Sequence, residues 1–374
     1  MKKYLLWIAA LTLAVMMATA GCSTDPAADP DTPQQQADLM LIIGGERVEE
    51  IPGEGESTEG VGWRLSNEAG AYTLTLENAQ INDLLLETME YYPPLVVRGN
   101  LNLELVGDNT LTAIERGIDI VNGVITVSGD GSLTINSDKV GINQSTIGET
   151  CQLNIESGQI TIKSKQIGIA ISMLTLSGGS LTVSDGIFGL WGTANDFLPL
   201  LTVSGGELRA SGSEGGIYCE RVAITGGTIE TEGAADTGFG LNCSQLTVDL
   251  GSGSLTARGG NSALIVAQPT PDVPQLVIGA NTAVVDENYT LQQADATYSF
   301  TQENETIYQD YQALLYADED GVAFDEDTTI FINVAKEITF QYQPAAASSD
   351  APQPGGGQSS DQPVDADDKV PVQE

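Results

Sequence analysis

A short motif returns along the chain at nearly constant intervals, and this periodicity limits the possible folds more than any other feature. The motif is a small residue followed by Ile or Leu. It occurs at Gly117, Gly141, Gly168, Gly189, Gly216, Gly240 and Ala263, at intervals of 21 to 27 residues. A fixed period of roughly 20–50 residues is typical of solenoids, propellers and other arrays. The sequence therefore predicts a stack of similar units.

Each period contains short segments in which apolar and polar residues alternate around a glycine turn. Two examples are LTLSGGSLTV at 174–183 and LTVSGGELRA at 201–210. Such segments are too short and too regularly alternating for helices. We expect an all-β chain that forms a right-handed parallel β-helix with coils of about 24 residues, stacked at the ~4.8 Å spacing of paired strands. A propeller blade needs about 40 residues, and a β-sandwich does not explain the period.

Alternation also predicts which residues face outward in each coil. In the first strand of the coils the outward residues are Thr126, Asn154, Thr175, Thr202, Ala223 and Thr247. In the second strand they are Thr112, Thr134, Thr161, Thr182, Arg209, Glu230 and Thr256.

Composition shifts along the chain indicate its organisation. The predicted segments are a lipoprotein signal peptide at 1–21, a disordered tether at 22–37, an N-terminal cap with lead-in coils at 38–94, the repeats at 95–268, a C-terminal cap or small β domain at 269–343, and a disordered acidic tail at 344–374.

The first 22 residues have the pattern of a bacterial export signal. Two lysines precede an apolar core, which ends at the small residues Thr19-Ala20-Gly21 before Cys22. Cysteine at this position is typical of a lipobox, so we expect Cys22 to be lipidated. The alternative is an ordinary secretory signal. The predicted location is the extracellular face of a bacterial cell membrane, reached through the lipid anchor alone.

Charge and cysteine content exclude some functions and disfavour others. The chain has 14 Lys and Arg, 52 Asp and Glu, no His, and a net charge of −38. This acidity disfavours a nucleic-acid partner, and every mechanism that needs a histidine is excluded. Beyond Cys22 lie Cys151, Cys219 and Cys243. Because Cys219 and Cys243 both stand two residues after the Ile or Leu of the motif, we expect them to stack inside the helix as buried reduced thiols, with a disulfide as the alternative.

The run LNLELVGDNTLTA at 101–113, followed by Gly117-Ile118 and by VSGDGSLTI at 127–135, resembles a known family. It is similar to clostridial surface proteins described as carbohydrate-binding-domain-containing, which have a pectate-lyase-like right-handed parallel β-helix. The resemblance covers roughly residues 62–290. It implies a non-catalytic surface protein that binds polysaccharide or a cell-wall glycan, sometimes with calcium.

Two other functions remain as alternatives to non-catalytic polysaccharide binding. The first is that of a pectate-lyase-like polysaccharide lyase or another carbohydrate-active enzyme, and the second is that of a structural or adhesive surface protein that binds another protein. The outward columns carry few charges, and we predict no catalytic residue and no metal site. Arg209 and Glu230 fit an exposed ion pair between neighbouring coils. Asp108 and Asp130 share one register by sequence, which fits either turn hydrogen bonds or a Ca²⁺ ion, the one cofactor considered.

A polysaccharide site is best predicted along the residues that directly follow the Ile or Leu of the motif. This outward column reads Asp119, Asn143, Ala170, Trp191, Tyr218, Asn242 and Ile265. Aromatic rings pack against sugar rings, and Asp and Asn side chains bind hydroxyl groups. The candidate carbohydrate-binding residues are therefore Asp119, Asn143, Trp191, Tyr218 and Asn242. The alternative is that residues 195–200 fold over the two rings and bury them.

Overall fold

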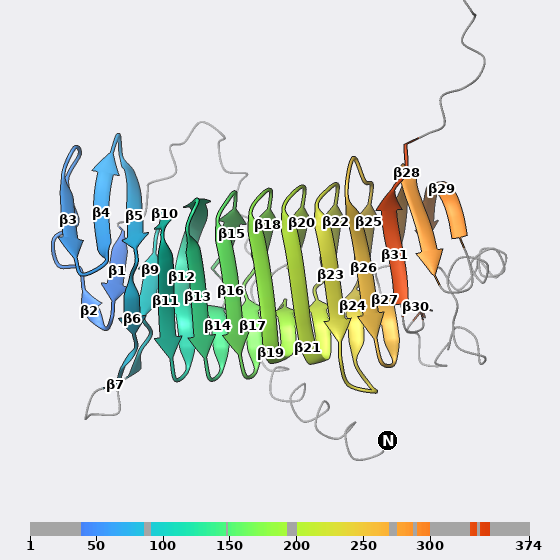
Figure 1. The fold of residues 1–374 in the computed structure, drawn as a ribbon, viewed down its shortest axis with the longest axis horizontal. Helices are drawn as coiled ribbons and strands as arrows, with labels where there is room; N and C mark the ends of the chain where they lie inside the picture. Colours follow the sequence, from blue (N-terminus) through green and yellow to red (C-terminus); the bar gives the residue numbers. More distant parts are fainter. Residues whose placement is uncertain are drawn as a thin grey trace, which may run out of the picture. The chain divides into compact units, whose positions relative to one another are not determined.

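The computed structural model describes residues 39–85, 91–146, 149–192, 200–268, 275–286, 290–299, 330–334 and 337–344. These residues form strands and turns and contain no helix, so none of them belongs to a helix that could span a membrane. The strands wind into a parallel β-solenoid of about seven turns with coils of about 24 residues (Figure 1), which confirms the predicted fold class. The predicted signal peptide, Cys22 and the tether lie outside the described residues, as does the predicted tail from residue 345 onward.

Each coil contributes to three parallel sheets. The first sheet contains β5 (Ala71–Glu77), β10 (Leu101–Val106), β15 (Cys151–Ile155), β18 (Met173–Leu176), β20 (Leu200–Val203), β22 (Arg221–Ile224), β25 (Gln245–Val248) and β28 (Gln275–Asp286). The second contains β6 (Gln80–Asn82), β11 (Asp108–Ala113), β13 (Ser132–Ser137), β16 (Gln159–Ser164), β23 (Thr228–Gly233) and β26 (Ser254–Gly259). The third contains β9 (Leu95–Arg98), β14 (Val140–Gln144), β17 (Ile167–Ala170), β24 (Phe239–Cys243) and β27 (Ser262–Gln268).

Three longer strands turn a corner and belong to two sheets. β12 (Arg116–Gly129) runs from the third sheet into the first. β19 (Ser180–Trp191) and β21 (Glu207–Tyr218) run from the second sheet into the third.

The outward column of the first sheet matches the predicted register from Thr126 to Thr247. In the second sheet Thr112 faces outward as predicted, but its predicted register is wrong, because Thr110 is the residue opposite Thr134 and Thr112 lies opposite Asn136. The two threonines of β11 are two residues apart and therefore lie on the same face of the strand. Alternation alone does not decide which of them lies opposite Thr134 of the next coil.

Leucine, isoleucine and valine side chains fill the interior. The Ile or Leu of the motif forms one continuous buried column, namely Ile118, Ile142, Ile169, Leu190, Ile217, Leu241 and Leu264. Cys219 and Cys243 follow this column on adjacent coils and are buried thiols, as is Cys151. Burial of apolar side chains in stacked columns is the main source of stability in such a fold.

Antiparallel strands cover both ends of the solenoid. At the N-terminal end, β4 (Trp63–Glu68) pairs with β5, β3 (Ser57–Gly60) pairs with β4, and β1 (Met40–Ile43) pairs with β9 and with β2 (Glu46–Arg47). Beside them, β7 (Leu84–Leu85) and β8 (Tyr91–Tyr92) form a separate pair. At the C-terminal end, β31 (Glu337–Tyr342) pairs with β26 and β28, β30 (Ile330–Val334) with β27, and β29 (Thr290–Ser299) with β28.

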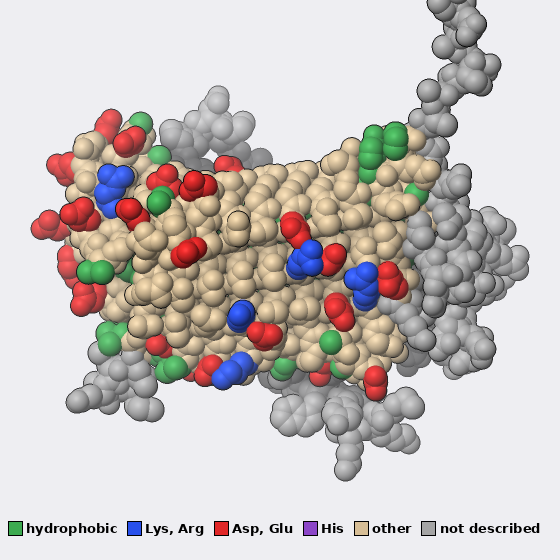
Figure 2. Space-filling view, viewed as in Figure 1, with side chains coloured by type: hydrophobic (Ala, Val, Ile, Leu, Met, Phe, Trp, Pro, Cys, Tyr) green, Lys and Arg blue, Asp and Glu red, His purple; other side chains and the backbone are tan. Residues whose placement is uncertain are grey.

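Charged side chains are unevenly distributed over the face in Figure 2. Acidic groups gather over the N-terminal cap strands at the left, while the middle of the solenoid shows few charges, most of them with an opposite charge nearby. Arg209 contacts Glu207 and Glu230, and Lys165 contacts Asp138. These are exposed ion pairs, which contribute little to stability.

Candidate functional site

The residues that follow the motif form two in-register ladders on the third sheet. Asp119, Asn143 and Ala170 are successive register partners on β12, β14 and β17. Trp191, Tyr218, Asn242 and Ile265 follow each other on β19, β21, β24 and β27. Because Ile169 pairs with Leu190 one residue earlier, the two ladders join into the column that the sequence predicts.

The glycine of the motif explains why the third sheet keeps this register. A Cβ atom at Gly141 or Gly168 would lie under 3.0 Å from a side chain of the second sheet and from the carbonyl oxygen of the next motif glycine. Real Cβ atoms do not approach other atoms so closely. The motif position is therefore a point of close approach both between sheets and between coils, which fixes the direction of the residues around it.

Four aromatic rings cluster on the outer side of the third sheet. The rings of Trp191 and Tyr218 stack with centroids 4.8 Å apart and planes at 24°. Phe188 contacts Trp191 at a centroid distance of 4.3 Å, and Phe239 lies 6.1 Å from Phe188 and 6.2 Å from Tyr218. All four side chains are half-buried. We call Phe188, Trp191, Tyr218 and Phe239 the aromatic cluster.

Both residues of the central pair are half-buried, and their rings are offset from each other. Carbon atoms in contact are about 3.5–4.0 Å apart, so a centroid distance of 4.8 Å between Trp191 and Tyr218 requires an offset stack. In an offset stack neither ring covers its neighbour completely.

Sequence reasoning missed Phe188 and Phe239. Both belong to a second outward column, which consists of the residues that come directly before the motif. Phe188 pairs with Gly215, which pairs with Phe239. The repeated pattern Phe-Gly-Leu at 188–190 and 239–241 was the sequence pattern that could have revealed them.

A small apolar pocket lies at the corner between the third and first sheets, against the aromatic pair. Its volume is about 30 Å³. It is lined by Ile169, Ile171, Ser172, Leu174, Leu190, Trp191, Gly192, Leu200, Leu201, Ile217, Tyr218 and Cys219. We call it the corner pocket.

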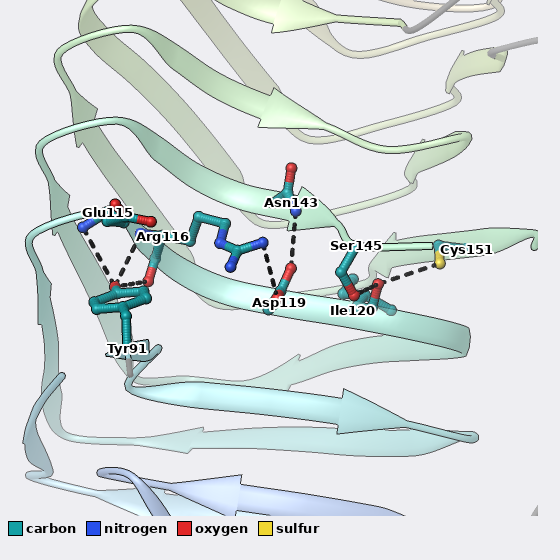
Figure 3. A network of polar contacts seen from close by, with 8 residues as sticks. All are labelled: Tyr91, Glu115, Arg116, Asp119, Ile120, Asn143, Ser145 and Cys151. Carbon is teal, nitrogen blue, oxygen red and sulfur yellow. Dashed lines mark hydrogen bonds and ion pairs between the residues drawn. The ribbon is translucent and has the colours of Figure 1, made fainter. Parts of the chain in front are cut away.

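The polar end of the column is a hydrogen-bonded network around Asp119 (Figure 3). Asn143 Nδ2 donates a hydrogen bond of 2.8 Å to Asp119 Oδ1, and the Arg116 guanidinium lies 3.3 Å from Asp119 Oδ2. The Tyr91 hydroxyl donates to the carbonyl of Arg116 at 2.9 Å and accepts from its backbone N–H at 3.0 Å. These contacts fix the start of β12 and the direction of the Arg116 side chain.

Asp119 is less accessible than the alternation predicts. It stands in the outward column, yet it is only 6% exposed. Burial raises the pKa of Asp119, while the hydrogen bond from Asn143 and the charge of Arg116 oppose this shift without cancelling it. The Asp119 carboxylate therefore mainly orients the Asn143 amide and has little contact with solvent. Asn143 is the more exposed polar group of the pair.

The polar and aromatic groups do not form one continuous surface of large side chains. Ala170 lies between Asn143 and the aromatic pair and is 8% exposed. Asn242 stands beyond Tyr218 and is half-buried. The structure thus brings Trp191, Tyr218 and Asn242 together and keeps Asp119 and Asn143 as a separate group.

The predicted register of Asp108 and Asp130 is wrong. Asp108 lies opposite Ser132, and the Ser132 hydroxyl donates a hydrogen bond of 2.8 Å to its carboxylate. The turn after β12 places Asp130 two residues before this position, so the two carboxylates are not stacked. No group of three or more Cys, Asp or Glu side chains suited to a metal ion occurs within the described ranges.

Comparisons of the chain with protein-family models, with curated proteins and with solved structures found no match.

Proposed function

We propose that this protein is a cell-surface lipoprotein that binds polysaccharide on the third sheet of its β-solenoid without cleaving it. The observation that carries the proposal is the offset Trp191–Tyr218 stack on adjacent coils, within a cluster of four rings. Ring faces of this kind pack against the apolar faces of sugar rings. Asn242 adds an amide that can donate to and accept from hydroxyl groups.

Periodicity supports a polymeric ligand. Outward residues recur at the ~4.8 Å spacing of neighbouring strands, so successive units of a glycan chain can contact Trp191, Tyr218 and Asn242 in turn. The ligand class is a neutral glycan, because a protein of net charge −38 repels polyanions at low ionic strength.

A double variant tests the proposal. Trp191→Ala/Tyr218→Ala removes the stacked pair, and Thr175→Ala/Thr202→Ala is the matched control, because these threonines also stand outward on adjacent coils, in the first sheet. We expect the control to be retained on insoluble neutral polysaccharides like the wild type, and the aromatic variant to be washed off. Both must keep the wild-type β-type circular dichroism. Equal retention of the two variants would rule out the aromatic cluster as the binding site.

The lipid anchor belongs to the same proposal. It rests on the sequence around Cys22, outside the described residues. Cys22→Ala should move the protein from the detergent phase to the aqueous phase in a phase-partition experiment, and equal partitioning of the two forms would contradict anchoring.

One observation favours a second candidate function, that of a polysaccharide-cleaving enzyme. Asp119 is a buried carboxyl group with a raised pKa beside Arg116, a combination found at catalytic sites as well as in structural networks. Release of soluble sugar by the wild type, and its loss in Asp119→Asn, would support this alternative. If no soluble sugar is released from any polysaccharide to which the protein binds, the enzyme function is ruled out for these polysaccharides and the binding function stands.

A further inference from the structure

We propose that the corner pocket receives the acetyl group of an acetylated neutral glycan whose sugar ring rests against Trp191 and Tyr218. This inference rests on the proposed function and narrows its substrate class. Trp191 and Tyr218 belong to the aromatic cluster and are also among the residues that line the pocket, so a sugar on their rings lies beside the pocket.

The size of the pocket matches a group of about three heavy atoms. One water molecule needs roughly 10–15 Å³ of such space, and the pocket offers about 30 Å³. An acetyl group has three heavy atoms beyond the atom that carries it. A whole pyranose ring does not fit this volume.

The lining favours a methyl group over water or a hydroxyl group. Ile169, Leu190 and Ile217 come from the buried motif column, and Ile171, Leu174, Leu200 and Leu201 add four more aliphatic side chains to the lining. Water in such a site finds too few polar partners, so a methyl group that displaces it gains apolar contact.

The polar atoms of the lining are few and mostly engaged. The Ser172 hydroxyl donates to Gln144 Oε1 at 2.5 Å, and the Cys219 thiol donates to the carbonyl of Arg221 at 3.2 Å. Among the described residues, the Tyr218 hydroxyl has no hydrogen-bond partner. It is therefore available to bind the carbonyl or the amide N–H of an acetyl group at the pocket rim.

Two pairs of neutral ligands isolate the acetyl group. N-acetylchitohexaose and cellohexaose share a β-linked glucose backbone and differ at the substituent on carbon 2. Acetylated mannan and the same mannan after alkaline deacetylation differ only in acetyl esters. We expect titration calorimetry to show about fivefold to tenfold tighter binding of the acetylated member in at least one pair, the gain expected for one buried methyl-sized group with one added contact. The pair that shows it identifies whether the acetyl is an amide or an ester.

A pocket-filling variant locates the effect. Leu200 is half-buried and lines the pocket, and Met173, its register partner on the preceding coil, is also half-buried and is not among the lining residues. Leu200→Phe should bind both members of a pair equally, at the affinity of the wild type for the unacetylated one. Met173→Phe, the matched control, should keep the preference for acetylated ligand.

The outcomes separate this inference from the function on which it rests. If the wild type binds acetylated and unacetylated ligands equally, the acetyl site is refuted while glycan binding stands. The same holds if Leu200→Phe, folded by circular dichroism, keeps the full preference. If the wild type binds none of the four ligands and no insoluble polysaccharide, the proposed function itself fails.

Discussion

At the scale of single residues, the motif glycines show how a sequence period becomes a spatial constraint. A side chain at Gly168 would collide with Val183 of the second sheet and with the backbone of Gly189 in the next coil. The backbone conformation at Gly168 is open to any residue, so the requirement is one of space alone. Glycine therefore recurs at this position because the same lack of space recurs in successive coils.

Gly168→Ala should destabilise the protein by about 1–3 kcal/mol, the usual cost of overpacking a well-packed site. Gly251→Ala is the matched control, because a Cβ there meets only the carbonyl oxygen of Thr225 at 3.5 Å, an ordinary contact. Urea unfolding of the two variants and the wild type measures the difference. A Gly168→Ala variant as stable as Gly251→Ala would show that the coils can move apart freely.

Asp119 should make stability depend on pH. Burial raises its pKa, so the folded protein keeps this proton at pH values where the unfolded chain, with a pKa of about 3.9, has lost it. The stability that the proton contributes is present below that value and is lost as pH rises through the raised pKa. The free energy of unfolding of the wild type minus that of Asp119→Asn should therefore fall as pH increases through this range. A difference that grows with pH would contradict the raised pKa.

The three cysteines of the solenoid should all be reduced. Burial raises the pKa of Cys151 and of Cys219 to about 12 and that of Cys243 well above its ordinary value. A thiol reagent that attacks thiolate should react slowly with the folded protein at pH 8 and should count three thiols after unfolding of a Cys22→Ala chain. A count of one, as a Cys219–Cys243 disulfide would give, or a count of none would contradict the reduced state.

At the scale of strands, alternation predicted the inward and outward faces of the first sheet, because each of its strands buries one face completely. It could not place Thr112, since β11 has two outward threonines and its partner strand decides between them. It also could not predict the burial of Asp119. Outward direction follows from the period of two, whereas exposure depends on neighbouring groups such as Arg116 and Asn143.

The C-terminal cap strand β31 should be essential for stability. Its Phe340 is fully buried opposite Leu255 and Val284. Phe340→Ala should cost about 3–5 kcal/mol, and it should promote association by weakening the cover over the strand edges of β26 and β28. Tyr342→Ala, on the same strand but 39% exposed, is the control and should have little effect. Urea unfolding with light scattering checks both, and equal stability of the two variants would show that β31 is a dispensable addition.

At the scale of the whole molecule, the fold could be predicted because contacts repeat between neighbouring coils. A period in the sequence then directly becomes a period in space. The site was harder to predict, because the outward column carries Ala170 in one coil and rings or amides in the neighbouring coils. The period predicts positions, and only the side chains at those positions decide what a ligand meets.

Removal of one complete coil should leave a folded protein. Deletion of residues 221–244 joins Glu220 to Gln245, which stands in the register position of Arg221. The shortened chain should keep its β-type circular dichroism and a single thermal transition, at a lower Tm because one interface between coils is lost. Deletion of residues 221–232, half of that coil, is the control and should prevent folding, because it shifts every following strand to the wrong sheet. A folded half-coil deletion would contradict this account of the register.

The antiparallel caps also affect how such a molecule can change over generations. Because β4 and β31 terminate the stack at each end, the number of coils between them can change without creating a new exposed edge. A duplication or loss of one coil's worth of codons lengthens or shortens the outer face by one step and leaves both ends intact. The length of the outer face that an extended ligand can contact can thus change during evolution by one coil at a time. Such a change does not require any substitution in the remaining coils.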